Sequence, residues 1–219
     1  MTPRFAKAVD PVFSLVLDLL DRIDRGQKIS AQDEKVRITQ ALQNAGAHLS
    51  ESEEWVRYAK YALIAWIDSE LSIVREWDGR DWWLQNSLEI DYHGQGLANH
   101  DFFARAREAA TLANRDALEV YYVCVVLGFR GFYESANTED RMRIIDSLQL
   151  PPDLKSWTRR QAQAIRLQQD RPTITDTSRQ ADVAPPLDGK QTLLGTAVML
   201  AIIAAVCLPL IYILLQSKT

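Results

Sequence analysis

The segment ALEVYYVCVVLGFRGFY, residues 117–133, determines the fold class of the chain. Taken alone, its VYYVCVV core suits a buried strand, because short runs of β-branched and aromatic residues are typical of strands covered on both faces. The segments on either side have helical patterns, however, and no run of alternating polarity elsewhere offers a strand to pair with it. We therefore predict a helix over this segment and an all-α fold.

Apolar residues on either side of this segment recur at three- and four-residue intervals, which is the spacing of an amphipathic helix. Ser30 and Asp153 are typical N-cap residues, and Gly26 marks the end of the first helix. These signals predict about seven to eight helices in one compact domain. The expected helices cover residues 5–23, 30–49, 51–74, 101–112, 117–133, 138–148 and 153–169.

The segment LLGTAVMLAIIAAVCLPLIYILL, residues 193–215, contains no charged residue. As a helix it would reach roughly 34 Å, enough to cross a hydrocarbon core of about 30 Å, so it predicts a single membrane span. The amino terminus has charges at Arg4, Lys7 and Asp10 among its apolar positions and does not resemble a signal peptide. The expected parts are a cytoplasmic helical domain over residues 1–170, a flexible proline-containing linker over 171–190, and a transmembrane anchor with a short periplasmic tail over 191–219.

The composition limits the classes of function. The chain has 25 basic and 29 acidic residues and a net charge of −4. This acidic balance argues against a nucleic-acid surface and against a general attraction to anionic lipid, so protein partners are expected. The spacing of the two cysteines, Cys124 and Cys207, is not that of metal ligands, and the same holds for the three histidines. No residue lies in a nucleophile motif. The sequence predicts a protein that is not an enzyme and holds neither a metal nor a cofactor.

Two other functions are compatible with the sequence but less favoured. Gly94 and Gly96 form a G-x-G pattern before a predicted helix, where backbone N–H groups can bind phosphate, and a membrane-bound enzyme could use residues 94–101 in this way. No strand precedes this pattern and no third glycine follows it, so a simple loop is the favoured interpretation. The other alternative is a tail-anchored regulatory protein that binds a partner helix in a hydrophobic groove.

The third predicted helix has an acidic residue in its apolar stripe. With Trp66 as the origin and about 100° per residue, Glu70 falls near +40° among the apolar positions, whereas Asp68 falls near 200°, where solvent or a partner is expected. A desolvated carboxylate is costly unless it is paired, and Arg130 on the later apolar helix is the best candidate partner. Two interpretations stay open: Glu70 and Arg130 form a structural polar pair, or Glu70 lines a cleft that another protein uses.

The region between residues 77 and 89, which is predicted as a loop, is rich in aromatic and acidic side chains. Trp82 and Trp83 lie in it, and we expect them to be partly exposed, with packing and partner recognition as equal alternatives. Together with the two acids of the third helix, this region is the expected partner-binding surface, which adds Glu89 to the candidates.

Three separated segments together resemble a known family. They are YALIAWIDSELSI (Tyr61–Ile73), WWLQNSLEIDYHGQGLANHDFFARA (Trp82–Ala106) and LEVYYVCVVLGFRGFY (Leu118–Tyr133). They resemble the TssL proteins of type VI secretion systems, which are related to the DotU (IcmH) proteins of type IVB systems. The resemblance implies a cytoplasmic domain built as a hook of two small helical bundles. It also implies a single-pass anchor in the inner membrane of a Gram-negative bacterium.

The resemblance further implies partners and a site. Members of this family are not enzymes. They assemble with the large TssM (IcmF-like) protein and the TssJ lipoprotein, self-associate partly through the span, and present the cytoplasmic domain to the baseplate proteins TssK and TssE. An acidic pair found in many members corresponds here to Asp68 and Ser69, so the second acid is absent, and whether Glu70 substitutes for it is open. We therefore expect a docking subunit of a secretion apparatus, of either the type VI or the type IVB branch.

Overall fold

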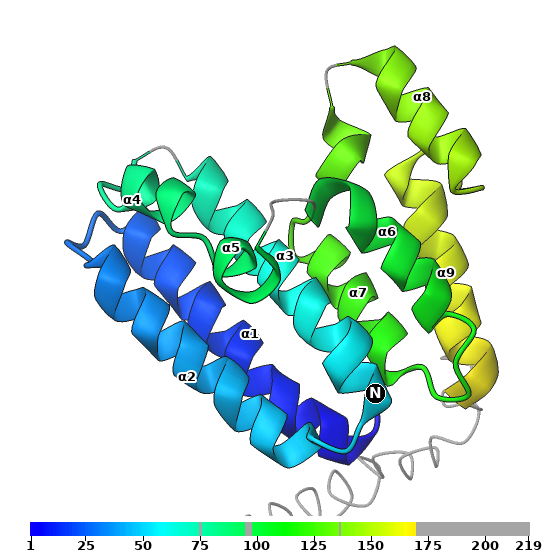
Figure 1. Ribbon diagram of the computed structural model, residues 1–219, viewed down its shortest axis with the longest axis horizontal. Helices are drawn as coiled ribbons and strands as arrows, with labels where there is room; N and C mark the ends of the chain where they lie inside the picture. The colour runs from blue at the N-terminus through cyan, green and yellow to red at the C-terminus, as the bar shows by residue number, and fades with distance from the viewer. Residues whose placement is uncertain (75, 95–97, 136, 170–219) are drawn as a thin grey trace, which may run out of the picture. The chain divides into compact units, whose positions relative to one another are not determined.

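The computed structural model describes residues 1–74, 76–94, 98–135 and 137–169, and all regular secondary structure in these ranges is helical (Figure 1). The all-α prediction is confirmed, and the VYYVCVV run forms a helix. Two short helices lie between residues 80 and 93, where the sequence pattern predicts a loop, so the prediction is wrong in this region. The elements are α1 (Pro3–Asp24), α2 (Ala31–Leu49), a π-helical turn η1 (Trp55–Ala59), α3 (Lys60–Ile73), α4 (Arg80–Gln85), α5 (Leu88–His93), α6 (Ala98–Ala109), α7 (Asp116–Val126), a 3-10 turn η2 (Gly131–Glu134), α8 (Thr138–Ser147) and α9 (Leu154–Gln169).

Helix α3 is the centre of the domain. It contacts α4, α5, α6 and α7, and Figure 1 shows the α1–α2 pair on one side of it and α6, α7 and α9 on the other. Every residue from Tyr61 to Asp68 is buried. Because neighbouring helices cover α3 on several sides, burial does not follow one stripe. The expectation that the Asp68 side of this helix faces solvent or a partner is wrong.

Helices α1 and α2 lie side by side and pack against this centre (Figure 1). The buried residues of α1 recur at the predicted three- and four-residue intervals, and the ring of Phe13 lies 5.1 Å from the ring of Trp66 on α3. Ser30 is the N-cap of α2, as predicted, and its side chain accepts a hydrogen bond from the backbone N–H of Asp33 at 3.3 Å. Leu17 is an apolar residue of α1 that is exposed.

Helix α7 ends earlier than the sequence pattern predicts. It stops at Val126, and Gly128 then adopts a φ of +133°, a conformation that residues with a side chain rarely reach. The 3-10 turn η2 follows. The chain therefore changes direction between Val126 and Arg130, so Arg130 lies beyond the end of the helix on which it was expected.

Aromatic rings join α6 and α9 to the segment that follows α7. The rings of Phe102 and Phe129 stack with their centroids 3.9 Å apart, and the ring of Phe103 meets Trp157 of α9 edge-on at 5.3 Å. Asp153 caps α9, as predicted, because its Oδ1 accepts a hydrogen bond from the backbone N–H of Ser156 at 2.8 Å. Helix α9 is therefore fixed at its start by the cap and along its length by packing against α7.

The described helices belong to one compact unit, Met1–Asp170. Within the described ranges, none of the helices combines the length and the apolar character that crossing a membrane requires. The predicted linker over residues 171–190 and the predicted anchor over residues 191–219 lie outside the described residues.

Candidate functional site

A cleft of about 360 Å³ opens beside α3. Its walls come from α3, from α4 and α5, and from the turn that follows α7. Four of the predicted site residues lie in these walls: Asp68, Trp83, Glu89 and Arg130. They share the walls with Ser69, Ile73, Leu84, Gly128 and Glu134.

Asp68 is 9% exposed and accepts three hydrogen bonds. Its Oδ1 accepts one from the indole Nε1 of Trp83 and one from the backbone N–H of Leu88, both at 3.0 Å. Its Oδ2 accepts one from the backbone N–H of Glu89 at 2.7 Å. Leu88 and Glu89 begin α5, and the free N–H groups of a helix start favour a carboxylate. Asp68 therefore joins α3 to both α4 and α5.

The surroundings of Asp68 act on its pKa in opposite directions. Burial raises the pKa above its ordinary value, whereas the three hydrogen bonds and the positive charge of Lys35 oppose this rise. Lys35 also forms an ion pair with Asp91 of α5 at 2.6 Å, which fixes α2 against the short helices. The contacts of Asp68 are therefore those of a residue that holds the cleft wall together.

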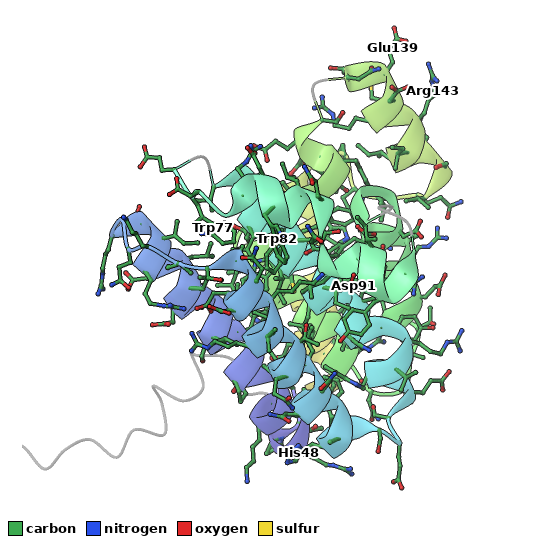
Figure 2. The ribbon with its side chains drawn as sticks, turned by 60° about the vertical axis from the view of Figure 1, so that its left-hand side comes forward. His48, Trp77, Trp82, Asp91, Glu139 and Arg143 are labelled. Carbon is green, nitrogen blue, oxygen red and sulfur yellow. The ribbon has the colours of Figure 1, made fainter. Side chains whose placement is uncertain are left out.

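The two tryptophans of α4 have different surroundings. Trp83 is fully buried, with its ring 6.1 Å from the ring of Trp77. Trp82 is partly buried and faces α2, where the Nζ of Lys35 lies 5.9 Å from its ring; Figure 2 shows Trp82 on this side of the domain. The expectation of partial exposure holds for Trp82 and is wrong for Trp83. Trp82 also lies apart from the cleft, in a separate hollow with Val36 of α2.

Glu89 is a second buried acid of the cleft wall. Its backbone N–H is one of the donors to Asp68. Burial raises the pKa of Tyr61, and the negative charge of Glu89 adds to this rise. Because most of the side chain is covered, little of it is available at the surface that was expected to contact a partner.

Glu70 has a different environment from Asp68, although only one residue separates them. Its Oε1 is buried and has no hydrogen-bond partner among the described residues. The carboxylate lies against Gly128, where an added Cβ would come within 2.5 Å of Oε1. Burial raises the pKa of Glu70 to about 7; the positive charge of Arg130 opposes the rise and the negative charge of Glu134 adds to it.

Arg130 does not form the predicted direct pair with Glu70. Its Nη1 donates instead to the carbonyl oxygens of Val125 at 2.9 Å and Phe129 at 3.3 Å, and the described part of the chain contains no ion pair between Arg130 and Glu70. The early end of α7 explains the difference, because the chain turns before Arg130. The guanidinium still lies near enough to act on the pKa of Glu70, and it is exposed in the cleft.

The rim of the cleft combines exposed apolar and charged side chains. Ile73 and Leu84 are 63% and 46% exposed. Arg130 and Glu134 are exposed on the wall that follows α7. Apolar side chains beside charges of both signs can contact a protein surface, where the apolar atoms are buried and the charges set the orientation.

Sequence reasoning missed several residues of the cleft. A signal for Gly128 exists, because two glycines interrupt the apolar run at LGFRG and argue against one unbroken helix. Leu84 and Glu134 have no such signal, since only the folded chain brings them to one cleft. Residues 95–97 of the G-x-G region lie outside the described residues. In the ranges that are described, no three His, Cys, Asp or Glu side chains are grouped to hold a metal ion.

Comparisons with known proteins agree with this fold. Residues 4–217 match the family model for the type VI secretion system protein DotU. No protein with a curated description matches the chain. The chain is similar to the solved cytoplasmic domain of TssL from Acinetobacter baumannii, with a TM-score of 0.53, 21% identity, and coverage of 66% of this chain and 94% of that one. It is also similar to SciP/TssL from enteroaggregative Escherichia coli 042, with a TM-score of 0.49, 24% identity, and coverage of 68% and 88%.

The likeness to the Acinetobacter structure shows the fold, and the family match gives the identity. That match extends over nearly the whole chain, so it includes the three segments that carry the resemblance and also the apolar residues 193–215. The chain belongs to the DotU family of type VI secretion system proteins.

Proposed function

We propose that this chain is a structural docking subunit of a type VI secretion apparatus. Residues 193–215 anchor it in the inner membrane, its helical domain lies in the cytoplasm, and its carboxyl end reaches the periplasm. Membership of the DotU family supports the assignment to the apparatus. The observation that carries the docking role is the cleft beside α3, whose rim exposes Ile73 and Leu84 next to Arg130 and Glu134.

The chemistry of the cleft supports binding as its mode of action. Both oxygens of Asp68 are engaged in holding α4 and α5, so this acid is committed to structure. The exposed apolar side chains of Ile73 and Leu84 can each contribute roughly 1–2 kcal/mol when a partner covers them. The opposite charges of Arg130 and Glu134 then select the orientation of that partner.

We propose a baseplate protein as the occupant of the cleft, with TssK and TssE as the candidates that the family resemblance implies. The TssM (IcmF-like) protein and the TssJ lipoprotein are the proposed partners in the membrane complex. Self-association is proposed to use the apolar residues 193–215. This division leaves the cytoplasmic cleft available for the baseplate.

A charge introduced into the rim tests the docking role. In the full-length chain, Ile73→Asp and Leu84→Asp should each lower co-purification with the baseplate partner at least about tenfold, because a charge that the partner covers without pairing it is costly. The melting temperature should change little, since both side chains are exposed. Val56→Asp is the matched control, because Val56 is 62% exposed on η1 and does not line the cleft. Normal co-purification of both rim variants would remove the cleft from consideration.

The anchor is tested separately from the cleft. We expect the full-length chain to stay in the membrane pellet after an alkaline wash and a chain without residues 193–215 to appear in the supernatant, because a span of this length inserts stably. Release of the full-length chain by the wash would contradict the anchoring role while leaving the cleft experiment valid.

A further inference from the structure

Helix α9 has four basic residues and no acidic residue, in a chain whose net charge is −4. All four, Lys155, Arg159, Arg160 and Arg166, are exposed. The acid nearest to the helix start is the cap, Asp153. Its hydrogen bonds from Ser156, together with the charge of Arg159, hold its pKa below the ordinary value. The helix is therefore a concentrated positive surface on an acidic protein.

Three of these cations share one face of α9. At about 100° per residue, Lys155, Arg159 and Arg166 fall within roughly 40° of one another and span about 16 Å of helix length. Trp157 and Ile165 are buried on the other side, and α9 contacts α7. Figure 1 shows α9 at the edge of the domain, with α6 and α7 on its inner side. The basic face therefore points outward.

Of the four cations of α9, Arg159 acts on the nearby carboxylate of the cap, Asp153. In the part of the chain that the structure describes, none of the four forms an ion pair with an acidic side chain, whereas Arg143 of the neighbouring helix α8 pairs with both Glu139 and Asp140. Leu167 adds an apolar group and is 77% exposed. It lies seven residues after Arg160 and so shares a side of the helix with it. Leu167 and Arg160 lie about 100° around the helix from the face that carries Lys155, Arg159 and Arg166, so any attraction of that face to anionic lipid is electrostatic.

The position of α9 in the chain brings it near a membrane. Only residues 170–192 separate it from the apolar residues 193–215. A chain of that length reaches at most about 80 Å, so anchoring by the apolar segment keeps α9 close to the bilayer and raises its effective concentration at the lipid surface. The cytoplasmic leaflet carries anionic lipid headgroups, whose charge is opposite to that of this face.

We propose that the Lys155, Arg159 and Arg166 face of α9 binds the anionic phospholipid surface of the membrane that holds the chain. The inference rests on the proposed anchoring by residues 193–215. The acidic net charge does not oppose it, because at physiological ionic strength a charge acts over only about 8 Å, so the local face decides the interaction. Contact along α9 sets the orientation of the cytoplasmic domain against the bilayer.

A probe on α9 in the full-length chain tests the proposal. Gln163→Cys places a fluorophore on the exposed side of α9, in a background with Cys207→Ala, while the buried Cys124 stays unlabelled. The chain is reconstituted into vesicles of phosphatidylcholine with roughly one-third phosphatidylglycerol and a headgroup-attached quencher. We expect strong quenching in these vesicles and little in phosphatidylcholine alone or at about 0.5 M salt.

Charge variants identify the groups responsible. A triple variant should bind the anionic lipid surface about a hundredfold more weakly, at roughly fivefold per charge. It combines Lys155→Gln, Arg159→Gln and Arg166→Gln. The matched control removes three exposed basic charges elsewhere, Arg25→Gln, Arg37→Gln and Arg57→Gln, and should leave the quenching unchanged. Equal quenching in neutral vesicles, or no loss in the α9 variant, would overturn the proposal.

Two further outcomes separate this inference from its alternatives. Impaired secretion in the α9 variant with unchanged quenching would assign the face to an acidic protein and overturn lipid binding. Release of the chain from the vesicles by an alkaline wash would contradict the anchor instead. In that case the same labelled chain, added to preformed vesicles, must still prefer anionic over neutral lipid for the α9 proposal to stand.

Discussion

Asp68 and Glu70 lie two positions apart on α3, and their surroundings are opposite. Asp68 gives both carboxylate oxygens to donors on α4 and α5, whereas Glu70 leaves Oε1 against Gly128 without a partner in the described part of the chain. The first acid links three helices, and the second is a carboxylate whose charge the fold disfavours. On a central helix, the neighbouring elements decide the role of an acid, and its angle on a helical wheel does not.

The largest effect should come from removing the partnered acid. Asp68→Ala leaves three buried or partly buried donors without their acceptor, and at about 1–3 kcal/mol per unsatisfied group we expect a loss of on the order of 4 kcal/mol. For a domain of this size, that loss lowers the melting temperature by roughly 10 °C. Thermal unfolding measures it. A shift within about 2 °C of wild type would show that the three hydrogen bonds contribute little.

The next effect concerns the glycine beneath the unpartnered acid. Gly128→Ala should cost about 1–3 kcal/mol, because its φ of +133° strains any residue with a Cβ and the new methyl group meets Glu70. Adding Glu70→Ala should recover only the steric part of this loss. Chemical unfolding of the two single variants and the double variant separates the contributions. Full recovery in the double variant would mean that the backbone at residue 128 is not strained.

The indole donor to Asp68 should have an intermediate effect. Trp83→Phe removes the hydrogen bond to Oδ1 and leaves a small gap, so we expect a destabilisation of about 1–2 kcal/mol. Trp82→Phe is the matched control on the same helix, because Trp82 is partly exposed and faces α2, and it should cost less than about 0.5 kcal/mol. The denaturant midpoints of the two variants give the difference. Equal destabilisation by the two substitutions would show that the hydrogen bond from Trp83 to Asp68 contributes little to stability.

The smallest effect should appear as a pH dependence at Glu70. Burial raises its pKa from an ordinary value of 4.5 to about 7, so its protonated form favours folding. The corresponding stability is fully present below pH 4.5 and is lost as the pH rises through about 7. Because the side chain is partly exposed, the loss is on the order of 1 kcal/mol.

Glu70→Gln should remove this dependence, because the amide stays neutral. The variant should match wild type near pH 5 and exceed it at about pH 8, as urea unfolding at the two pH values would show. Glu134→Gln, which changes an exposed acid nearby, is the control and should keep most of the dependence. A Glu70→Gln variant that is less stable than wild type at the higher pH would indicate that Glu70 does form a direct ion pair with Arg130.

Much of the fold could be predicted from the sequence because its signals are local. The long helices have enough turns to show an apolar period, and the caps Ser30 and Asp153 act on N–H groups within three residues of themselves. The short helices α4 and α5 have six residues each, too few for a period to appear. Their absence from the prediction is the reason that Asp68 was expected at the surface.

The candidate site could be predicted only in part. The sequence points to the part of α3 that lines the cleft, to Arg130 as a charge in an apolar segment, and to Trp83 as an aromatic side chain in a polar one. It does not give their contacts, because the backbone turn at Gly128 redirects Arg130 away from the direct pair. The spacing of apolar residues along a helix does not predict a contact that depends on a single backbone angle.

Site-specific cross-linking in secreting cells tests the docking role most directly. A photo-reactive amino acid at position 84 of the full-length chain lies on the exposed rim of the cleft, and one at position 56 on η1 serves as the control. We expect light-dependent cross-links to a baseplate protein from position 84 and none from position 56. Cross-links to the baseplate from position 56 alone would show that the partner contacts another face and that the cleft beside α3 is not the docking surface.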